Sequence, residues 1–409
     1  MKDRYLIIAD DFTGANDTGV QLRRRGLSTN VYFSNVKSMM NPNSSIVIDT
    51  ETRNTDPDTA YSIVKQSVSN IDFAKYRYVI KKVDSTIRGN IAAEVKAVDE
   101  EYKPELIIFA PALPDLDRTT ESGVQKLKGI NICNTELAKD PKSPVKEDNL
   151  ERILKKVYEE YVIHVSLDEL RNGSFNMDGA RLFTFDAVTN VDLERIIEAA
   201  NATGKKILWI GSAGIADRIV ETEVKTLPVL GVVASVSSTT NQQIKYCENA
   251  GYKLIQIQVH DVLLKEAGTS QYVQEVIKSL HKGQDTILLA NTSYDREELY
   301  KSVEAGEKIG MNISQVGDYI RKLLGEMTKE IISQAKISGI FVTGGDTALG
   351  LLTCMEAEGS KILSEILVGV PLIKVVGGYM DGIKVVTKAG AFGKEDTIAF
   401  AMRKIKEKN

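Results

Sequence analysis

The sequence predicts an α/β protein of two domains, each a mostly parallel sheet flanked by helices, with the active site in the interdomain cleft. Its 409 residues exceed the length of one ordinary domain. Short runs rich in Val, Ile and Phe alternate with longer segments of helical period, as in sheets whose strands are joined by crossover helices. Most of these runs are followed by polar or glycine-bearing turns, so ligand-facing residues are expected at the carboxyl ends of the strands.

The apolar runs give the expected strands in chain order. In the first half of the chain they cover residues 5–9, 30–33, 46–49, 78–81, 106–110, 161–165, 181–184 and 207–210. In the second half they cover residues 231–234, 254–258, 286–290, 339–343, 372–376 and 384–387. The segments between them read as the helices that connect parallel strands.

Residues 221–228 are the expected boundary between the domains. The polar sequence Glu-Thr-Glu-Val-Lys-Thr precedes Leu227 and Pro228, and a new strand begins directly after them. We therefore predict domains of residues 1–225 and 226–409.

Residues 111–144 do not follow the alternation of strand and helix. Residues 123–127, 128–129 and 130–133 read as the strand, turn and strand of a hairpin, and the rest reads as loop. Long irregular segments in compact domains are often functional, but an arm that reaches into a second copy of the chain would look the same. The sequence leaves both alternatives open, and a homodimer is among the assemblies it allows.

The overall composition narrows the expected partners. The formal net charge is only −4, and no run of Lys or Arg is long enough to suggest a nucleic-acid surface. The apolar run before Asp10 is too short for a signal-peptide core, and no later stretch approaches the roughly 18 apolar residues of a membrane span. Cys133, Cys247 and Cys354 lie far apart without a CxxC pair, which favours a reducing compartment. We expect a cytoplasmic protein that binds neither nucleic acid nor membrane.

The first expected strand ends in two adjacent carboxylates. Asp10 and Asp11 point in different directions there, so at least one of them can face a crevice. Thr13 and Gly14 then open a helix whose free amides favour an anionic group. The alternative is that the two carboxylates only cap this turn.

A second polar cluster follows the fourth expected strand. Lys82 and Arg88 are suited to hold a carboxylate, while Asp84 and Ser85 are suited to bind hydroxyl groups. Arg53 follows the third expected strand and is offered to the same crevice. This mixture of cations, carboxylates and hydroxyls suits a polyhydroxy acid better than an apolar ligand. Taken singly, each group is also typical of a solvated loop.

In the second half, the strand at residues 339–343 runs into a glycine turn and then a helix. The turn contains Gly344, Gly345, Asp346 and Thr347. Glycines let the backbone approach a phosphate closely, and the helix N-terminus supplies donors and partial positive charge. Alone, Gly-Gly-Asp is a weak signal, because many turns between strand and helix contain it without a ligand.

Two further turns strengthen the prediction of a nucleotide site. Gly390 lies in a second glycine turn, and Ser235 and Ser237 lie in a hydroxyl-rich turn after the first strand of this half. The sequence contains no GxxxxGK[ST] spacing and no GxGxxG fingerprint after a strand, so a P-loop and a dinucleotide-binding fingerprint are both missing. The turn at residues 211–214 reads equally well as an anion site or as close packing of a helix on a strand.

Histidine is too scarce for two common kinds of active site. The chain has only His164, His260 and His281, and none lies in a glycine-rich or Asp-rich turn. A Ser–His–Asp hydrolase or a histidine-based metal site is therefore not expected, and general-base work falls to an Asp.

Taken together, these turns resemble those of the four-carbon acid sugar kinase family. The matching motifs are ADDFTGANDTG at residues 9–19, DTETR at 49–53, KVDSTIRGN at 82–90, APALPDLDRTT at 110–120, DPKSP at 140–144, GSAGIA at 211–216, GGDTA at 344–348 and TKAGAFG at 387–393. They span nearly the whole chain in the order of the family. The serine turn reads Ala-Ser-Val-Ser where the family often has Gly-Ser-x-Ser, and Ala389 and Ala391 stand where Ser or Gly is common.

The resemblance implies an N-terminal domain that binds the acid sugar and a C-terminal domain that binds ATP. It implies phosphoryl transfer to the terminal C4 hydroxyl of a tetronate such as threonate, erythronate or a 3-oxo-tetronate. The substrate contacts would then be Asp10, Asp11, Arg53, Lys82, Asp84, Ser85 and Arg88. The nucleotide contacts would be Ser235, Ser237, Gly344, Gly345, Asp346, Thr347 and Gly390, with Mg²⁺ bridging the phosphates.

Asp346 is our first candidate for the general base. It lies where the γ-phosphate is expected, by analogy with glycine-rich turns that end in Asp in other sugar kinases. Asp84 and Asp11 are the alternatives. Two other functions stay open: an NAD(P)-dependent oxidoreductase acting on a similar acid, which the missing fingerprint disfavours, and a non-catalytic sugar-acid-binding protein that would release no ADP.

Overall fold

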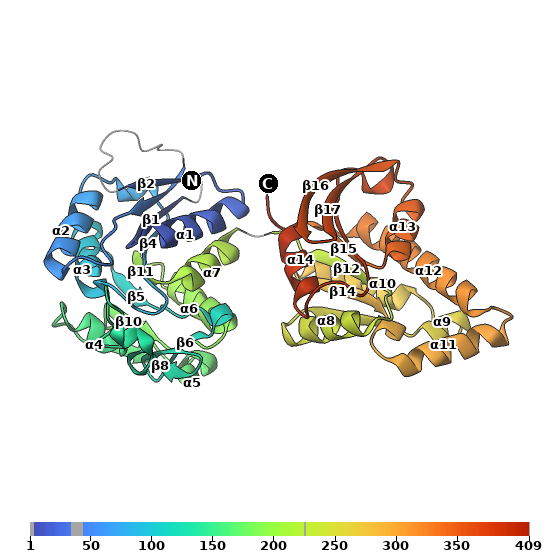
Figure 1. The fold of residues 1–409 in the computed structure, drawn as a ribbon, viewed down its shortest axis with the longest axis horizontal. Helices are drawn as coiled ribbons and strands as arrows, with labels where there is room; N and C mark the ends of the chain where they lie inside the picture. Colours follow the sequence, from blue (N-terminus) through green and yellow to red (C-terminus); the bar gives the residue numbers. More distant parts are fainter. Residues whose placement is uncertain (1–3, 34–43, 225, 409) are drawn as a thin grey trace. The chain divides into compact units, whose positions relative to one another are not determined.

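The structure is a computed structural model that describes residues 4–33, 44–224 and 226–408. The chain divides into two compact units, Met1–Lys225 with Lys408–Asn409, and Thr226–Glu407 (Figure 1). Each unit has its own sheet and its own hydrophobic cores. The predicted boundary segment, residues 221–228, contains residue 225, which lies outside the described residues.

The N-terminal unit is built on eight parallel strands in the order β2-β3-β1-β4-β11-β5-β10-β9. Side chains alternate between its faces, so Ile7 enters one core and Ile8 the other. Because both faces are buried, these strands read in the sequence as nearly continuous apolar runs. The strands are β1 Tyr5–Ala9, β2 Thr29–Phe33, β3 Ser45–Asp49, β4 Tyr78–Lys82, β5 Leu106–Phe109, β9 Val162–Val165, β10 Leu182–Phe185 and β11 Ile207–Gly211.

Helices cover both faces of this sheet. Polar caps fix where they begin: Asp11 and Asp56 accept backbone hydrogen bonds at the start of the first two. On the face of Ile7 lie α1 Phe12–Arg24, α5 Leu167–Asn172, α6 Asn190–Ala202 and α7 Ala213–Glu223. On the face of Ile8 lie α2 Pro57–Val68, α3 Ile91–Tyr102 and α4 Leu150–Leu154.

The segment between β5 and β9 forms a small antiparallel sheet of its own. It consists of β6 Arg118–Glu121, β7 Val124–Leu127 and β8 Ile130–Asn131. The predicted hairpin corresponds to β7 and β8, but the prediction that the rest is loop was wrong for β6. The sequence of β6, Arg-Thr-Thr-Glu, has no apolar signal. It forms a strand because Thr120 is buried, pairs with Ala187 and donates to Gln125 Oε1 at 2.6 Å.

The C-terminal unit is built on seven strands in the order β13-β14-β12-β15-β18-β17-β16. The first five are parallel, and the last two are antiparallel additions at one edge. The strands are β12 Val229–Val233, β13 Lys253–Ile257, β14 Thr286–Ala290, β15 Gly339–Thr343, β16 Gly359–Leu367, β17 Val370–Val376 and β18 Lys384–Lys388.

This sheet also lies between two layers of helices. One face is covered by α9 Val259–Leu263, α10 Ser270–His281, α11 Arg296–Lys308, α12 Ile313–Gln334 and α13 Gly345–Cys354. The other face is covered by α8 Ser238–Asn249 and α14 Thr397–Ile405. Two domains, each with a mostly parallel sheet flanked by helices, confirm the predicted fold class.

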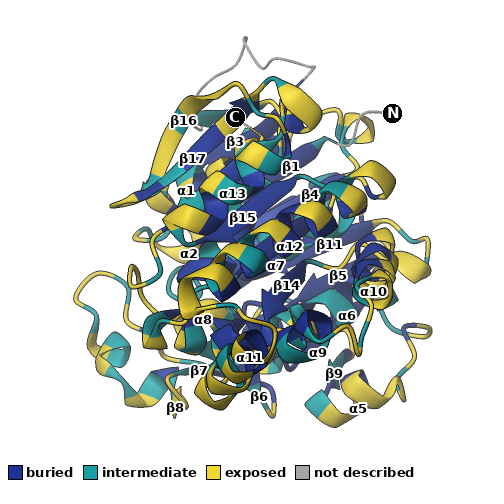
Figure 2. Ribbon diagram, turned by 90° about the vertical axis from the view of Figure 1, so that its right-hand side faces the viewer, coloured by how far each residue is buried: buried dark blue, intermediate teal, exposed yellow. Residues whose placement is uncertain are grey.

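Every strand predicted from an apolar run is present, with ends shifted by at most two residues. The strand that the sequence did not predict in this unit is β16. It lies at the sheet edge and is exposed along most of its length, so no buried face imposes an alternating pattern on it. Figure 2 shows the contrast between buried central strands such as β1, β4 and β15 and the exposed β16.

Among the helices of the described residues, none is both long enough and apolar enough to cross a membrane.

Candidate functional site

The carboxyl ends of three neighbouring strands bring the polar residues of the N-terminal unit together. β1 lies between β3 and β4, with Ala9 opposite Asp49 on one side and Lys82 on the other. The residues that follow these strands therefore meet at one edge of the sheet, where open parallel sheets bind their ligands. We call this group the charged cluster: Asp10, Asp11, Arg53, Lys82, Asp84 and Arg88.

Arg53 lies at the centre of the charged cluster. Its guanidinium donates to both oxygens of Asp10, at 2.7 and 3.0 Å, and to Asp11 Oδ2 at 2.7 Å. Burial opposes the charge of Arg53, but the hydrogen bonds to Asp10 raise its pKa above the ordinary value. Asp10 is buried, and both of its oxygens are occupied. In this structure Asp10 therefore orients Arg53, and the predicted contact of Asp10 with a substrate hydroxyl stays a prediction.

Asp11 links the charged cluster to α1. Its Oδ1 accepts from the Gly14 N–H at 3.0 Å and caps the helix, while its Oδ2 binds Arg53. Asp11 therefore caps the helix, as one alternative from the sequence held, and its second oxygen also belongs to the charged cluster. A Cβ at residue 14 would lie 2.5 Å from Asp11 Oδ1 and 2.8 Å from Lys82 Nζ, so this close approach requires glycine.

Lys82 is a buried cation with unused donors. It is 5% exposed, and its ammonium donates to the Val83 carbonyl at 3.0 Å. An ammonium has three N–H groups, and this is its one hydrogen bond to the described residues. Burial lowers the pKa of Lys82, against the opposing effect of the Asp10, Asp11 and Asp84 carboxylates. An anionic ligand that reaches this point would find donors free to bind it.

Asp84 and Arg88 form the second half of the charged cluster. Arg88 Nε and Thr86 Oγ1 both donate to Asp84 Oδ2, at 2.6 and 2.5 Å. Burial disfavours the carboxylate, but the hydrogen bond from Arg88 and the nearby cations lower the pKa of Asp84 to about 2. Ile87 has a φ of 54°, in the left-handed region that a β-branched residue avoids. The turn that carries this pair is therefore held in a strained conformation.

The segment between β5 and β9 borders the same cluster. Asp140 Oδ2 lies 3.5 Å from Arg88 Nη1, and Ser143 Oγ donates to the Arg53 carbonyl at 3.3 Å. Gln125 of β7 donates to the Ser85 carbonyl at 2.8 Å, which is how Ser85 is tied to this edge. Of the two alternatives for this segment, these contacts support a role beside the site within its own unit.

A buried ion pair beneath the cluster was missed by the sequence prediction. Lys81 Nζ lies 2.6 Å from Glu94 Oε2 of α3, and both side chains are essentially unexposed. Lys81 also donates to the carbonyls of Ile8, at 3.3 Å, and Lys82, at 3.0 Å, so it ties β1 to β4 just below their ends. Burial raises the pKa of Glu94, and Lys81 opposes that rise. The available signal was a Lys within an apolar strand, because such a residue needs a buried partner.

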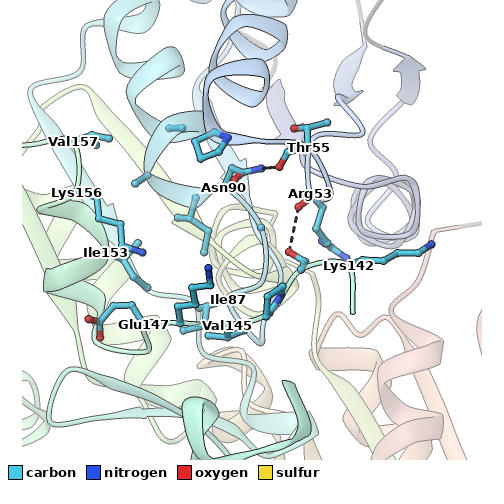
Figure 3. A pocket seen from close by; sticks show the side chains of 18 residues that line it. Arg53, Thr55, Ile87, Asn90, Lys142, Val145, Glu147, Ile153, Lys156 and Val157 are labelled. Atoms are coloured by element: carbon cyan, nitrogen blue, oxygen red, sulfur yellow. Dashed lines mark hydrogen bonds between the residues drawn. The ribbon is translucent and has the colours of Figure 1, made fainter. Parts of the chain in front are cut away.

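A cavity of about 510 Å³ opens beside the charged cluster (Figure 3). Of the predicted site residues, Arg53 alone lines it. Lys142, Lys146 and Lys156 line it as well, with Glu147 as their acidic neighbour, and Figure 3 shows Lys142 and Lys156 on opposite walls. The approach to Arg53 thus carries an excess of positive charge, which favours an anionic ligand.

In the C-terminal unit, the turn after β15 leaves space above a helix N-terminus. Gly344 adopts a φ of 98° directly before α13, and its N–H donates to the Lys388 carbonyl at 2.8 Å. A Cβ on Gly345 would meet no atom within 4 Å. The first turn of α13 is therefore open to a ligand, and its amides favour an anion there.

The next two residues of this turn have different surroundings. Thr347 is buried beneath the turn, and a Cβ on Gly344 would lie 3.1 Å from its Oγ1. The Asp346 side chain is 85% exposed and lies 3.4 Å from Arg321 Nη1 of α12. Asp346 is thus the accessible carboxylate at the mouth of the glycine turn.

The predicted serine turn and second glycine turn are bonded to each other. Ser237 Oγ and Thr240 Oγ1 donate to the Gly390 carbonyl at 2.7 and 2.9 Å. A Cβ on Gly390 would overlap Ser235 Oγ, so glycine is required at this approach. The two turns form one structure, which lies next to Gly344 because β12, β15 and β18 are neighbours in the sheet.

Lys388 anchors the joined serine and glycine turns, which we call the double turn. The sequence prediction did not name Lys388 as a site residue. It is 2% exposed, and its Nζ donates to the carbonyls of Ala389, Gly390 and Phe392 at 2.9, 3.0 and 3.1 Å. Burial lowers its pKa to about 8. Lys388 therefore fixes the turn and leaves a positive charge beneath it. The available signal was a Lys at the end of an apolar strand, inside the quoted TKAGAFG motif.

The turn at residues 211–214 serves packing. A Cβ on Gly211 would overlap the Ala110 carbonyl, and one on Gly214 would overlap the Ala112 carbonyl. Gly214 lies in the first turn of α7, so the two glycines let that helix lie directly against the chain that leaves β5. These contacts support the packing alternative.

The described residues contain no group of three or more His, Cys, Asp or Glu side chains placed to hold a metal ion. Mg²⁺ usually keeps several waters and binds through one or two carboxylates together with phosphates. The exposed Asp346 carboxylate beside the open turn fits that mode, with a nucleotide supplying the other ligands.

Two family models match the chain, one in each unit. Residues 5–219 match the sugar-binding N-terminal domain, and residues 230–398 match the nucleotide-binding C-terminal domain. The charged cluster lies in the first match, and the glycine and serine turns lie in the second.

Curated relatives extend the match over the whole chain. A D-threonate kinase of Salmonella typhimurium is 33% identical, with 99% of each chain covered. A D-erythronate kinase of Heliobacterium modesticaldum is 25% identical over 96% of this chain and 94% of the relative. A crystal structure from Bordetella bronchiseptica, of a domain of unknown function with bound citrate as a domain-swapped dimer, has a TM-score of 0.66 at 26% identity and covers 99% of both chains. The chain belongs to the four-carbon acid sugar kinase family.

Proposed function

We propose that this protein is an ATP-dependent kinase that phosphorylates the C4 hydroxyl of a four-carbon acid sugar. The observation that carries the proposal is the division of site chemistry between the two units. A charged cluster suited to a polyhydroxy acid lies in the unit that matches a sugar-binding domain. An open glycine turn suited to phosphates lies in the unit that matches a nucleotide-binding domain.

The acid would bind at the edge formed by β1, β3 and β4. Its carboxylate would contact the free donors of Lys82, because both guanidinium groups nearby already bind carboxylates. Its hydroxyls would contact the carboxylates of Asp10, Asp11 and Asp84, because each carboxylate can accept more hydrogen bonds than the protein already gives it. Threonate, erythronate and a 3-oxo-tetronate all carry the carboxylate and the C4 hydroxyl that this arrangement requires.

ATP would bind with its phosphates over Gly345 and beside the double turn that contains Gly390. The residues present fit a triphosphate: the helix amides are exposed, the space above them is open, and the Lys388 ammonium lies under the turn. Mg²⁺, when bound, neutralises charge on the phosphates, and Asp346 would hold it or act as the base beside it.

Asp346 is the preferred general base of the three candidates. Asp11 is already engaged by Gly14 and Arg53, and the hydrogen bond from Arg88 and the nearby cations lower the pKa of Asp84 to about 2, which weakens Asp84 as a proton acceptor. Asp346 has one exposed ion pair, with Arg321. Removal of the base in Asp346→Asn should lower kcat by about 10²- to 10⁴-fold. Unchanged turnover would exclude this role.

The C4 hydroxyl can be tested with a substrate that lacks only that group. ADP release should be measured with D-threonate, D-erythronate and 3-oxo-tetronate, and then with 2,3-dihydroxybutanoate. We expect ADP from at least one of the first three and none above background from the last. Turnover of 2,3-dihydroxybutanoate would place the phosphoryl group on another oxygen and contradict the proposal.

A homodimer is the assembly we propose. The support is the domain-swapped dimer of the Bordetella bronchiseptica relative, which matches this chain along its whole length. Light scattering during gel filtration should give twice the mass of one chain, and a monomer at micromolar concentration would contradict it.

A further inference from the structure

An apolar cavity of about 190 Å³ lies beside the glycine turn, and the phosphate contacts proposed above do not use it. It is bounded by the turn after β12 and by α11 and α12. Thr347 and Asp346 of the glycine turn line it too, so the cavity adjoins the turn that carries the proposed phosphate site. Seven of its twelve lining residues are aliphatic, and Arg321 also lines it; the aliphatic residues are Ala234, Val236, Leu299, Val303, Ile313, Val316 and Ile320.

Two of these aliphatic side chains are largely exposed to solvent. Val236 is 48% exposed and Ile313 is 65% exposed, although both line the cavity. Val236 also lies between Ser235 and Ser237, the two serines predicted to contact the nucleotide. Exposed apolar area at the mouth of a cavity is area that an apolar ligand would cover.

Gly317 of α12 provides an independent observation. It lies within a 22-residue helix, where glycine is unfavourable, and it lines the cavity. Packing explains two other glycines within helices of this unit. A Cβ on Gly306 would overlap Val316, and one on Gly325 would lie 3.0 Å from Cys354 Cβ. A Cβ on Gly317 would meet no atom within 4 Å. Glycine at a site without a protein neighbour lets a ligand approach the backbone closely.

We infer that this cavity, which we call the base slot, holds the nucleobase of the nucleotide against the backbone of α12 at Gly317. A nucleobase is flat and apolar on its faces, and aliphatic walls suit it better than they suit the charged acid. The inference rests on the proposed function in one respect, namely that the phosphates occupy the turn at Gly345.

The test is Gly317→Leu, which fills the base slot without meeting a protein atom at its Cβ. Binding of ADP and of inorganic tripolyphosphate should be measured by calorimetry for the whole chain. We expect the ADP dissociation constant to rise by about 10- to 100-fold, the loss associated with one stacked base. Tripolyphosphate, which has no base, should bind as in the wild type.

Ser314→Leu is the matched control, because it places the same side chain on an exposed position of α12 outside the base slot. It should leave both dissociation constants unchanged, and thermal unfolding should show that both variants are folded. Equal weakening of ADP and tripolyphosphate by Gly317→Leu, no weakening of ADP, or the same loss in Ser314→Leu would overturn the base slot. A wild type that binds neither ligand would instead overturn the nucleotide site itself.

Discussion

At the residue scale, the two arginines of the charged cluster are already paired with carboxylates in the absence of a ligand. Arg53 binds Asp10 and Asp11, and Arg88 binds Asp84. This pairing fixes the guanidinium groups, so the substrate binding that we propose at this cluster would require little further ordering of them. Lys82 differs, because its buried ammonium retains unused donors.

Replacing Arg88 by Ala should lower kcat/KM for the acid by about 10- to 100-fold, because Arg88 holds Asp84, the proposed contact of a substrate hydroxyl, and a hydrogen bond to a charged group contributes about 1.5–3 kcal/mol. Asp84→Ala should act in the same direction, since it leaves Arg88 without its carboxylate. ADP affinity should stay near that of the wild type in both variants, as measured by calorimetry. Arg152→Ala, at an exposed arginine of α4, is the control. If ADP affinity fell together with turnover, the division of roles between the units would be wrong.

Gly345→Val should abolish nucleotide binding while leaving the fold intact. No protein atom lies within 4 Å of the added Cβ, so the side chain enters only the space assigned to the phosphates. Gly359→Val on β16 is the matched control, because its Cβ also meets nothing within 4 Å. ADP titrations should separate the two variants, and normal ADP binding by Gly345→Val would argue against this turn.

We expect the Lys388 ammonium to give ADP binding a pH dependence. With a pKa of about 8, the amine is protonated at pH 7 and holds three carbonyls, and it loses charge and one donor as the pH rises through 8. The wild-type dissociation constant for ADP should rise between pH 7 and pH 9 by about tenfold, the effect of one charge-assisted hydrogen bond. In Lys388→Met, binding should be weak and nearly independent of pH over this range. A flat wild-type profile would show that the turn does not need the charge.

At the element scale, the apolar runs were sufficient to predict the parallel strands because both faces of each sheet are buried. The polar and glycine-bearing turns after those strands were sufficient to name the residues of the charged cluster and of the glycine turn as candidates. β6 and β16 escaped prediction because a four-residue polar strand and an exposed edge strand carry no periodic signal.

Pairing between elements could not be read from one sequence. Nothing in the spacing of residues along the sequence indicates that Asp10 accepts hydrogen bonds from Arg53, or that Glu94 of α3 forms an ion pair with Lys81 of β4. These contacts join residues that are distant in the chain and depend on how helix and sheet pack. Asp10 therefore has a role that the sequence did not indicate, the support of Arg53, while its contact with the substrate stays a prediction.

The buried pair of Lys81 and Glu94 can be tested by a double-mutant cycle. Lys81→Met or Glu94→Leu alone should lower the free energy of unfolding by about 3–5 kcal/mol, because each leaves one buried charge without a partner, whereas the double variant should recover most of the loss. The single tryptophan, Trp209, is buried in β11, so its fluorescence during urea unfolding reports on the N-terminal unit. Additive losses in the double variant would show that the two charges do not stabilise each other.

At the scale of the whole molecule, the chain combines two complete α/β units with different ligand chemistry. The N-terminal unit presents cations and carboxylates at the end of its sheet, and the C-terminal unit presents glycine and serine turns at the end of its own. Each unit has separate cores, so each can hold its ligand on a rigid scaffold.

The most direct test is an assay of ADP release with ATP, Mg²⁺ and a panel of four-carbon acids, followed in parallel at 340 nm with nicotinamide cofactors. We predict stoichiometric ADP and phosphorylated acid with at least one member of the panel, and no change at 340 nm. An absorbance change at 340 nm without ADP, or tight binding of an acid with neither signal, would contradict the assignment as a kinase.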